Sequence, residues 1–181
     1  DFLRSDLNPS KIRVLEIGFG TGLNAILTSE WAAAHQVKID YTTLEPFPLK
    51  SEVFEALNYH EFFEDKTVKE RFLALHNTPW EKEFQQNEFF TLLKTESKLQ
   101  DFAADSLFDI VFFDAFAPSK QSEMWDLEVI EKTVGLLDTN GAFVTYCAKG
   151  QLKRDLKAVG LTVETLPGPP GKKEMVRGVN R

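Results

Sequence analysis

An apolar run over residues 12–17 leads directly into three glycines at alternate positions, Gly18, Gly20 and Gly22, and this junction constrains the fold more than any other part of the chain. The run predicts a buried strand, and residues 24–34 have the composition of a helix. Glycine is needed in a tight strand-to-helix turn because the backbone there takes positive φ angles and a Cβ would block close approach. The chain therefore contains a strand-turn-helix unit whose turn can hold a ligand against bare backbone.

The spacing of the glycines and the residue before them indicate the ligand. The glycines depart from the Gly-x-Gly-x-x-Gly pattern with which dinucleotide-binding proteins hold a pyrophosphate. Glu16, within the strand just before the turn, would repel a pyrophosphate and attract a cationic ligand. S-adenosylmethionine, whose sulfonium is positively charged, fits both observations. The turn therefore predicts a methyltransferase.

Strand-like apolar runs alternate with helix-like stretches along the chain. Such alternation predicts an α/β fold with a mainly parallel sheet and with ligands at the carboxyl ends of its strands. The last two runs are joined by the short link 167–173, which suits an antiparallel hairpin at the sheet edge. We expect the Rossmann-like class I S-adenosylmethionine-dependent methyltransferase fold, with a seven-stranded sheet over residues 12–17, 39–44, 89–93, 108–113, 142–147, 161–166 and 174–179.

The 181 residues are enough for one domain with a sizeable core, and we expect a single domain over residues 1–181. Between Glu45 and Phe89 the chain is longer than one crossover helix needs, and it is rich in phenylalanine. We expect a helical insertion at about residues 46–88, with helices near 49–58 and 66–76. Phenylalanines at helical spacing usually face a core, which favours an extra packed layer over a surface that stacks on bases.

Charge is distributed unevenly along the chain. The net charge of −7 by itself argues against nucleic acid as a partner, because phosphate binding needs clustered Lys and Arg. From Gly141 onward, however, eight basic side chains are accompanied by only three acidic ones. A local basic patch of this kind on an acidic body can hold an RNA backbone.

The sequence also disfavours several classes of protein. No apolar run approaches the ~18 residues that span a bilayer, and the first residues do not form a signal peptide, so we expect a cytoplasmic protein without membrane contact. Cys147, the only cysteine, lies in an apolar run and is expected to be a packed thiol. His35, His60 and His76 have no short ligand spacing, so we expect no metal.

Acidic residues follow two of the expected strands. Glu45 ends the second strand, 25 residues after the middle glycine, where one carboxylate can accept hydrogen bonds from both ribose hydroxyls. Asp114 follows the fourth, where a carboxylate can hold an amine and help to remove its proton. Phe116 and Pro118 could then orient the acceptor, and Trp125 could stack on a base.

Five stretches of the chain, in this order and spacing, resemble the methyltransferase domain of the MnmC family, the bacterial tRNA wobble-uridine modification enzymes: residues 15–24, 45–49, 113–118, 124–125 and 171–175. The resemblance implies methyl transfer from S-adenosylmethionine to the 5-aminomethyl group of 5-aminomethyl-2-thiouridine in tRNA, giving 5-methylaminomethyl-2-thiouridine. It also implies a tRNA partner and a functional link to a separate flavin oxidoreductase, since the fused enzymes carry a flavin-binding domain that is not expected here.

The resemblance assigns roles residue by residue. Asp114 becomes the acid beside the amine. The predicted cofactor contacts are Glu16, Gly18, Phe19, Gly20, Gly22, Asn24, Glu45 and Asp114. With the basic end of the chain as an RNA surface, the predicted substrate contacts are Trp125, Lys149, Lys172 and Lys173.

Two departures from the family pattern affect the site. The family normally has a segment before the glycine strand, whereas about a dozen residues precede it here, so part of the substrate surface is expected to be missing. The family also tends to place a Gly-Asp pair near the adenine after the third strand, where this chain has residues 94–97, Lys-Thr-Glu-Ser. Thr95 and Glu96 are therefore the candidates for the adenine contact.

Two other interpretations stay open. An aminopropyltransferase resembling spermidine synthase would share the sheet, the acidic ribose contact and the strand-end aspartate. Its polyamine substrates call for several acids around the pocket and no basic patch, which disfavours it. A non-catalytic nucleotide-binding module would keep the fold alone, and the acidic residues beside the glycine turn disfavour that interpretation.

Overall fold

The computed structural model describes residues 11–168 and 171–181, which form one eight-stranded sheet with helices. Residues 1–10, most of the stretch before the glycine strand, and residues 169–170 of the expected hairpin link lie outside the described residues. The strands are β1 (Ile12–Ile17), β2 (Ile39–Leu44), β3 (Phe84–Asn87), β4 (Phe90–Thr95), β5 (Phe108–Phe113), β6 (Leu137–Thr145), β7 (Thr162–Pro167) and β8 (Glu174–Val179). The helices are α1 (Leu23–His35), α2 (Ser51–Glu55), α3 (Val68–Asn77), α4 (Leu127–Val134) and α5 (Gly150–Ala158), with short 3₁₀ turns η2 (Tyr59–Phe62) and η3 (Ser122–Trp125).

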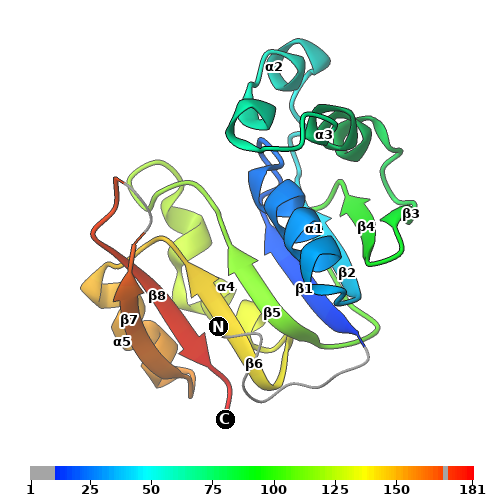
Figure 1. Cartoon of the computed structure of the whole chain (residues 1–181). Coiled ribbons are helices and arrows are strands. Elements are labelled where there is room, and N and C mark those ends of the chain that lie inside the picture. The colour runs from blue at the N-terminus through cyan, green and yellow to red at the C-terminus, as the bar shows by residue number, and fades with distance from the viewer. Residues whose placement is uncertain (1–10, 169–170) are drawn as a thin grey trace.

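The strand order is β3-β4-β2-β1-β5-β6-β8-β7, with β1 in the interior of the sheet (Figure 1). Strands β4, β2, β1, β5 and β6 run parallel. At one edge β3 pairs antiparallel with β4, and at the other β8 pairs antiparallel with both β6 and β7. The expected α/β fold, with a mainly parallel sheet and an antiparallel edge hairpin, is confirmed.

The expected count of seven strands is wrong by one, because β3 is not among the predicted strands. Its residues after Phe84 are Gln85, Gln86 and Asn87, which lack the apolar alternation of a half-buried strand. The strand pairs with the edge of β4, and the register shifts between Gln85 and Asn87. A short, polar and irregular strand is typical of a sheet edge, where it discourages pairing with other chains.

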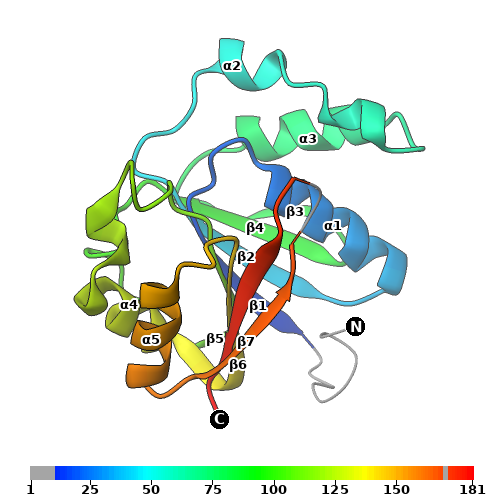
Figure 2. The same cartoon turned by 90° about the vertical axis from the view of Figure 1, so that its left-hand side faces the viewer.

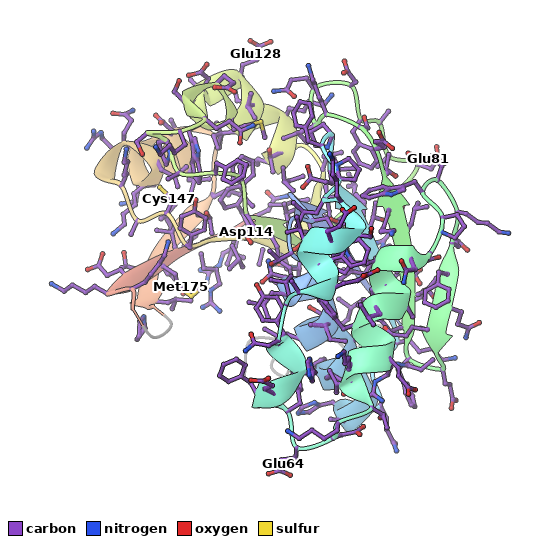
Figure 3. All side chains as sticks on the ribbon, turned by 90° about the horizontal axis from the view of Figure 1, so that it is seen from above. Glu64, Glu81, Asp114, Glu128, Cys147 and Met175 are labelled. Atoms are coloured by element: carbon purple, nitrogen blue, oxygen red, sulfur yellow. The ribbon has the colours of Figure 1, made fainter. Side chains whose placement is uncertain are left out.

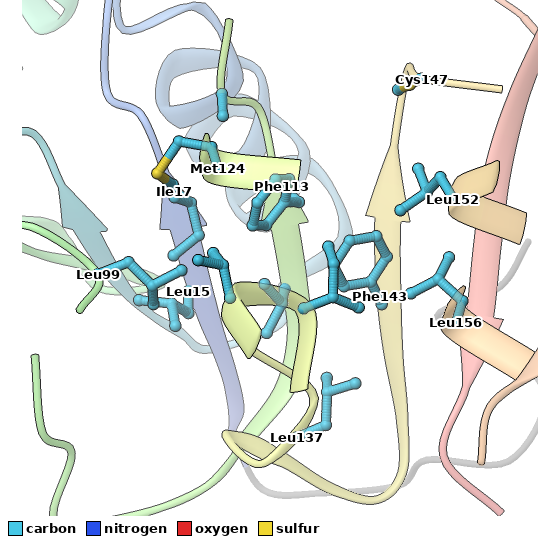
Figure 4. Close-up of a cluster of buried hydrophobic side chains, with 14 of the residues drawn as sticks. Leu15, Ile17, Leu99, Phe113, Met124, Leu137, Phe143, Cys147, Leu152 and Leu156 are labelled. Atoms are coloured by element: carbon cyan, nitrogen blue, oxygen red, sulfur yellow. The ribbon is translucent and has the colours of Figure 1, made fainter. Parts of the chain in front are cut away.

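Helices cover both faces of the sheet, and each face has its own apolar cluster. On the face covered by α1 and α3, the cluster includes Val14, Ile26 and Phe72. On the face covered by α4 and α5, the cluster includes Leu15 and Leu156 (Figure 4). Neighbouring residues of β1 therefore serve opposite clusters, as the alternation of side chains along a strand requires.

The segment between β2 and β3 lies at the end of the sheet toward which the parallel strands point (Figures 1 and 2). Its first helix, α2, is shorter than the expected helix at 49–58 and is followed by η2, whereas α3 nearly matches the expected 66–76. α3 ends at Asn77 because Pro79 disfavours a helical backbone at Thr78, which is extended. This segment is therefore placed beside the ends of the strands where ligands bind in such folds.

Within residues 11–168 and 171–181, every helix is too short or too polar to span a lipid bilayer. No group of three or more His, Cys, Asp or Glu side chains in the same ranges could hold a metal ion. His35 stacks on Trp31, and Cys147 is a buried thiol.

Candidate active site

The glycine turn between β1 and α1 has a backbone that other residues rarely adopt. Gly18, Gly20 and Gly22 have φ angles of 97°, 48° and 71°. A Cβ added to Gly18 would lie 3.0 Å from the Asp114 carbonyl oxygen, and one added to Gly22 would lie 2.8 Å from His76 Nε2. A Cβ added to Gly20 would have no neighbouring atom within 4 Å, so the middle of the turn is an open cradle.

Glu45 follows β2 and is tied to this cradle. Its Oε2 accepts a hydrogen bond from the Gly20 amide at 3.0 Å, and its Oε1 accepts one from the Phe47 amide at 2.9 Å. The side chain is half-buried, and each carboxylate oxygen can accept a further hydrogen bond. Glu45 therefore has the position and the acceptor capacity that a ribose contact requires.

Glu16 lies beneath the turn. Its side chain is 1% exposed, and its oxygens accept hydrogen bonds from Thr43 Oγ1 at 2.8 Å and from Asn24 Nδ2 at 3.0 Å. Burial raises the pKa of Glu16 to about 8, although these hydrogen bonds act in the opposite direction. Most Glu16 carboxyl groups are therefore protonated at pH 7. The sequence analysis expects a charged Glu16 that attracts a cationic ligand, whereas burial here favours the neutral form of this carboxyl group. The hydrogen bond from Asn24 links Glu16 to the site.

Asn24, in the first turn of α1, joins Glu16 to Asp114. Its Nδ2 donates to Glu16 Oε1 at 3.0 Å and to Asp114 Oδ2 at 2.9 Å. A primary amide carries two N–H donors on one nitrogen, so this side chain can serve both acids at once. The bridge links the strand beneath the turn to the end of β5.

Asp114 directly follows β5 and lies between the two halves of the molecule when it is seen from above (Figure 3). Its side chain is exposed, and its amide donates to the Ile17 carbonyl oxygen at 3.0 Å. Partial desolvation raises the pKa of Asp114, while the Asn24 hydrogen bond and the charge of Lys172 act against this rise. A carboxylate in this position can accept a hydrogen bond from an amine and take its proton.

Two aromatic side chains hold the loop after Asp114. The Tyr146 hydroxyl donates to the Ala115 carbonyl oxygen at 2.7 Å, and Trp125 Nε1 donates to the Phe116 carbonyl oxygen at 2.8 Å. Trp125, predicted to stack on a base, is half-buried with its N–H engaged in the loop. The Phe116 ring is 74% exposed and offers the larger free aromatic surface. Pro118, further along, is half-buried.

Tyr146 is not among the predicted site residues. Its position just after β6, beside the strand that leads to Asp114, was the available signal, but the apolar run around it indicated only a core strand. Lys172 Nζ lies 3.5 Å from the centre of the Tyr146 ring, so this predicted substrate contact does reach the site. The other two predicted basic contacts, Lys149 and Lys173, have exposed side chains.

The Phe19 ring turns away from the cradle into the cluster beneath α3. It is 4% exposed and lies 4.9 Å from the His76 ring and 6.2 Å from the Trp80 ring, centre to centre. The backbone of Phe19, and not its ring, therefore borders the turn. The fully buried Lys94 shares this cluster: its Nζ donates to the His76 carbonyl oxygen at 2.5 Å, and burial lowers the pKa of Lys94 to about 8.

Of the two predicted adenine contacts, Thr95 is hydrogen-bonded to Glu45 and Glu96 follows it in the chain. The Glu45 amide donates to the Thr95 carbonyl oxygen at 3.0 Å, which places the end of β4 next to the predicted ribose contact. Glu96 is exposed, and its amide donates to Glu81 Oε1 at 2.7 Å. The carboxyl ends of four parallel strands thus carry the site: the turn follows β1, Glu45 follows β2, Thr95 ends β4 and Asp114 follows β5.

Comparison with known proteins gives both a family and close relatives. Residues 66–181 match a family model described as S-adenosyl-L-methionine-dependent methyltransferase. The tRNA 5-methylaminomethyl-2-thiouridine biosynthesis bifunctional protein MnmC of Leptospira borgpetersenii serovar Hardjo-bovis is 29% identical over 91% of this chain, and that of Hydrogenovibrio crunogenus is 31% identical over 93%. This chain spans 26% of the length of each of these relatives.

Solved structures have the same fold. MnmC2 from Aquifex aeolicus superimposes with a TM-score of 0.74 at 22% sequence identity, covering 94% of this chain and 53% of that one. The N-methyltransferase NodS from Bradyrhizobium japonicum superimposes with a TM-score of 0.53 at 14% identity, covering 99% and 92%. These likenesses confirm the expected Rossmann-like class I architecture.

Proposed function

The chain belongs to the S-adenosyl-L-methionine-dependent methyltransferase family, and we propose from this premise that it methylates the 5-aminomethyl amine of 5-aminomethyl-2-thiouridine at the tRNA wobble position. The product would be 5-methylaminomethyl-2-thiouridine, the nucleoside in the names of the MnmC relatives. The observation that carries the proposal is the exposed Asp114 carboxylate, held by Asn24 at 2.9 Å beside the glycine turn. An amine bound there would lie next to the cofactor cradle.

The residues at the turn fit the cofactor. Gly20 leaves open space where another residue would carry a Cβ, and Glu45 can accept hydrogen bonds from ribose hydroxyls. We therefore assign the backbone of the turn, Asn24, Glu45 and the end of β4 at Thr95 to cofactor binding. When bound, S-adenosylmethionine supplies an activated methyl group on its sulfonium.

The residues on the other side of the site handle the amine. Only a neutral amine has the lone pair that accepts a methyl group, so the amine must lose a proton. Asp114 can take that proton, and the raised pKa of Asp114 makes it a better acceptor than an ordinary surface aspartate. Asn24 orients the Asp114 carboxylate, and Phe116 and Pro118 border the place of the acceptor, so that nitrogen and methyl group can approach to about 3 to 3.5 Å.

Exposed and basic residues supply the RNA contacts in this proposal. Lys149, Lys172 and Lys173 belong to the basic end of the chain and can neutralise phosphates. The exposed Phe116 ring can stack on a base, a role the sequence predicts for Trp125. Because the proposed substrate is tRNA, we also propose that the protein acts in the cytoplasm. We further propose a functional link to a flavin oxidoreductase that supplies the aminomethyl precursor, since the relatives are named bifunctional.

Methyl transfer to defined tRNA tests the proposal. Labelled S-adenosylmethionine is incubated with the protein and tRNA carrying either 5-aminomethyl-2-thiouridine or unmodified uridine at the wobble position. We expect label in the first tRNA alone, as 5-methylaminomethyl-2-thiouridine on nucleoside chromatography. Equal labelling of both tRNAs, or none although the protein binds S-adenosylhomocysteine, contradicts the proposal. Product formation from decarboxylated S-adenosylmethionine and putrescine would instead support the aminopropyltransferase interpretation.

A further inference from the structure

The helical segment between β2 and β3 contacts the glycine turn at Thr21, the residue between Gly20 and Gly22. The Tyr59 hydroxyl, from η2, donates to Thr21 Oγ1 at 2.9 Å. His76 Nε2, from the last turn of α3, lies 3.2 Å from the Thr21 carbonyl oxygen. The side chain and the carbonyl group of one turn residue are therefore both held from outside the turn.

His76 is itself fixed by its surroundings. Its ring stacks on Phe54 at 4.3 Å and lies 4.9 Å from both the Phe19 and the Phe72 rings. The backbone carbonyl of His76 accepts the hydrogen bond from buried Lys94. Burial lowers the pKa of His76 to about 4, so the ring is neutral at pH 7 and carries a single N–H. Because the Thr21 carbonyl can only accept, that N–H belongs on Nε2.

A turn with three glycines needs such support. Glycine has more backbone freedom than any other residue, so a glycine-rich turn loses much conformational entropy when a ligand orders it. Contacts that hold the turn in its binding conformation beforehand reduce that cost and strengthen binding. Gly22 fits this arrangement closely, since a Cβ at that position would lie 2.8 Å from His76 Nε2.

We propose that Tyr59 and His76 are positioning residues that hold the glycine turn through Thr21, so that the helical segment sets the affinity of the enzyme for S-adenosylmethionine. The segment then serves the cofactor side of the site, in addition to adding a packed layer to the fold. This role does not depend on the identity of the methyl acceptor, and it can be tested without RNA.

Calorimetric titration with S-adenosylhomocysteine tests the proposal on the whole chain. Tyr59→Phe removes one hydroxyl from a half-buried ring, and we expect binding to weaken about five- to tenfold, the equivalent of one lost hydrogen bond. His76→Leu should weaken binding at least as much. His76→Gln, which also loses the ring but can place a donor near the position of Nε2, should recover part of the affinity, and a purely structural role predicts no such recovery.

A mutant cycle and two control variants complete the test. The Tyr59 and Thr21 hydroxyl groups share one hydrogen bond. The double variant Tyr59→Phe/Thr21→Val should therefore bind S-adenosylhomocysteine no more weakly than Tyr59→Phe alone. The controls are His60→Leu and Phe62→Ala in the same segment, whose side chains make no hydrogen bond to the turn among the described residues. Both variants should bind S-adenosylhomocysteine as tightly as wild type. Unchanged affinity in Tyr59→Phe and His76→Leu overturns the proposal. If His76→Leu does not fold, Tyr59→Phe alone decides.

Discussion

The two sides of the active site differ in how far their side chains are exposed to solvent. On the cofactor side, Glu45 and Thr21 tie the glycine turn to β2 and to the helical segment, and Glu16 is buried beneath it. On the acceptor side, Asp114 is exposed and Phe116 is 74% exposed. The half assigned to the small cofactor is therefore preorganised around the glycine turn, whereas the half assigned to a macromolecular acceptor is open to solvent.

The Asn24 side chain forms a direct polar link between these two sides. Its amide donates both to buried Glu16 and to exposed Asp114. Substitutions on one side should therefore affect either cofactor binding or methyl transfer to the amine, and substitutions at Asn24 should affect both.

Asp114→Ala should have the largest effect and should separate the two sides most clearly. Without the carboxylate the amine loses its proton acceptor, so we expect methyl transfer to fall about 10²- to 10⁴-fold. Titration with S-adenosylhomocysteine should show nearly unchanged affinity, because the turn and Glu45 are intact. Full transfer activity in this variant would remove Asp114 from the mechanism.

Asn24→Leu should damage both sides of the active site together. It leaves Glu16 without one buried donor and Asp114 without its orienting bond, so we expect transfer rate and S-adenosylhomocysteine affinity each to fall about 10- to 100-fold. Asn24→Asp should be worse, since a third acid would join the other two. Asn58→Ala, at an exposed asparagine that bonds Glu61, is the matched control. A loss confined to one ligand would show that Asn24 does not join the sides.

Glu16→Gln should change how stability depends on pH. The folded-state pKa of Glu16 is raised to about 8 from its ordinary value near 4.5. Between these values the folded protein keeps a proton that the unfolded chain has released, so this group makes stability fall as the pH rises, by at most about 1.4 kcal/mol per pH unit. Below pH 4.5 and above pH 8 its contribution is constant.

Urea unfolding of wild type and Glu16→Gln between pH 5 and pH 8.5 measures this difference. The variant should lose less stability than wild type over the interval, because glutamine keeps the buried shape without an ionisable proton. Parallel stability curves for the two proteins would show that Glu16 is already ionised in the folded state at pH 5.

Trp125→Phe should have the smallest effect and should affect the acceptor side alone. The variant keeps an aromatic ring but loses the hydrogen bond to the Phe116 carbonyl, so the loop after Asp114 should become less ordered. We expect the transfer rate to fall about two- to fivefold, with S-adenosylhomocysteine affinity unchanged. Weaker cofactor binding in this variant would mean that the loop also supports the cofactor side.

Features encoded in short stretches of sequence were predictable. The turn, the strand before it and the acids after β2 and β5 are in the places that the pattern indicates, because glycine geometry and apolar runs act over a few residues. β3 was not predictable from its polar sequence, since it depends on the edge of β4. Buried Lys94 escaped prediction for a related reason: its aromatic and carbonyl partners come from α3, Trp80 and the turn.

The type of turn, the alternation of strands and helices, and the acids at the strand ends can all be read from the sequence. Each follows from local backbone preferences and local hydrophobic patterns. Long-range packing, in contrast, buries Glu16 and raises its pKa, joins it through one amide to Asp114, and holds Thr21 with Tyr59 and His76. These contacts join residues up to 90 positions apart, and long-range packing brings them together.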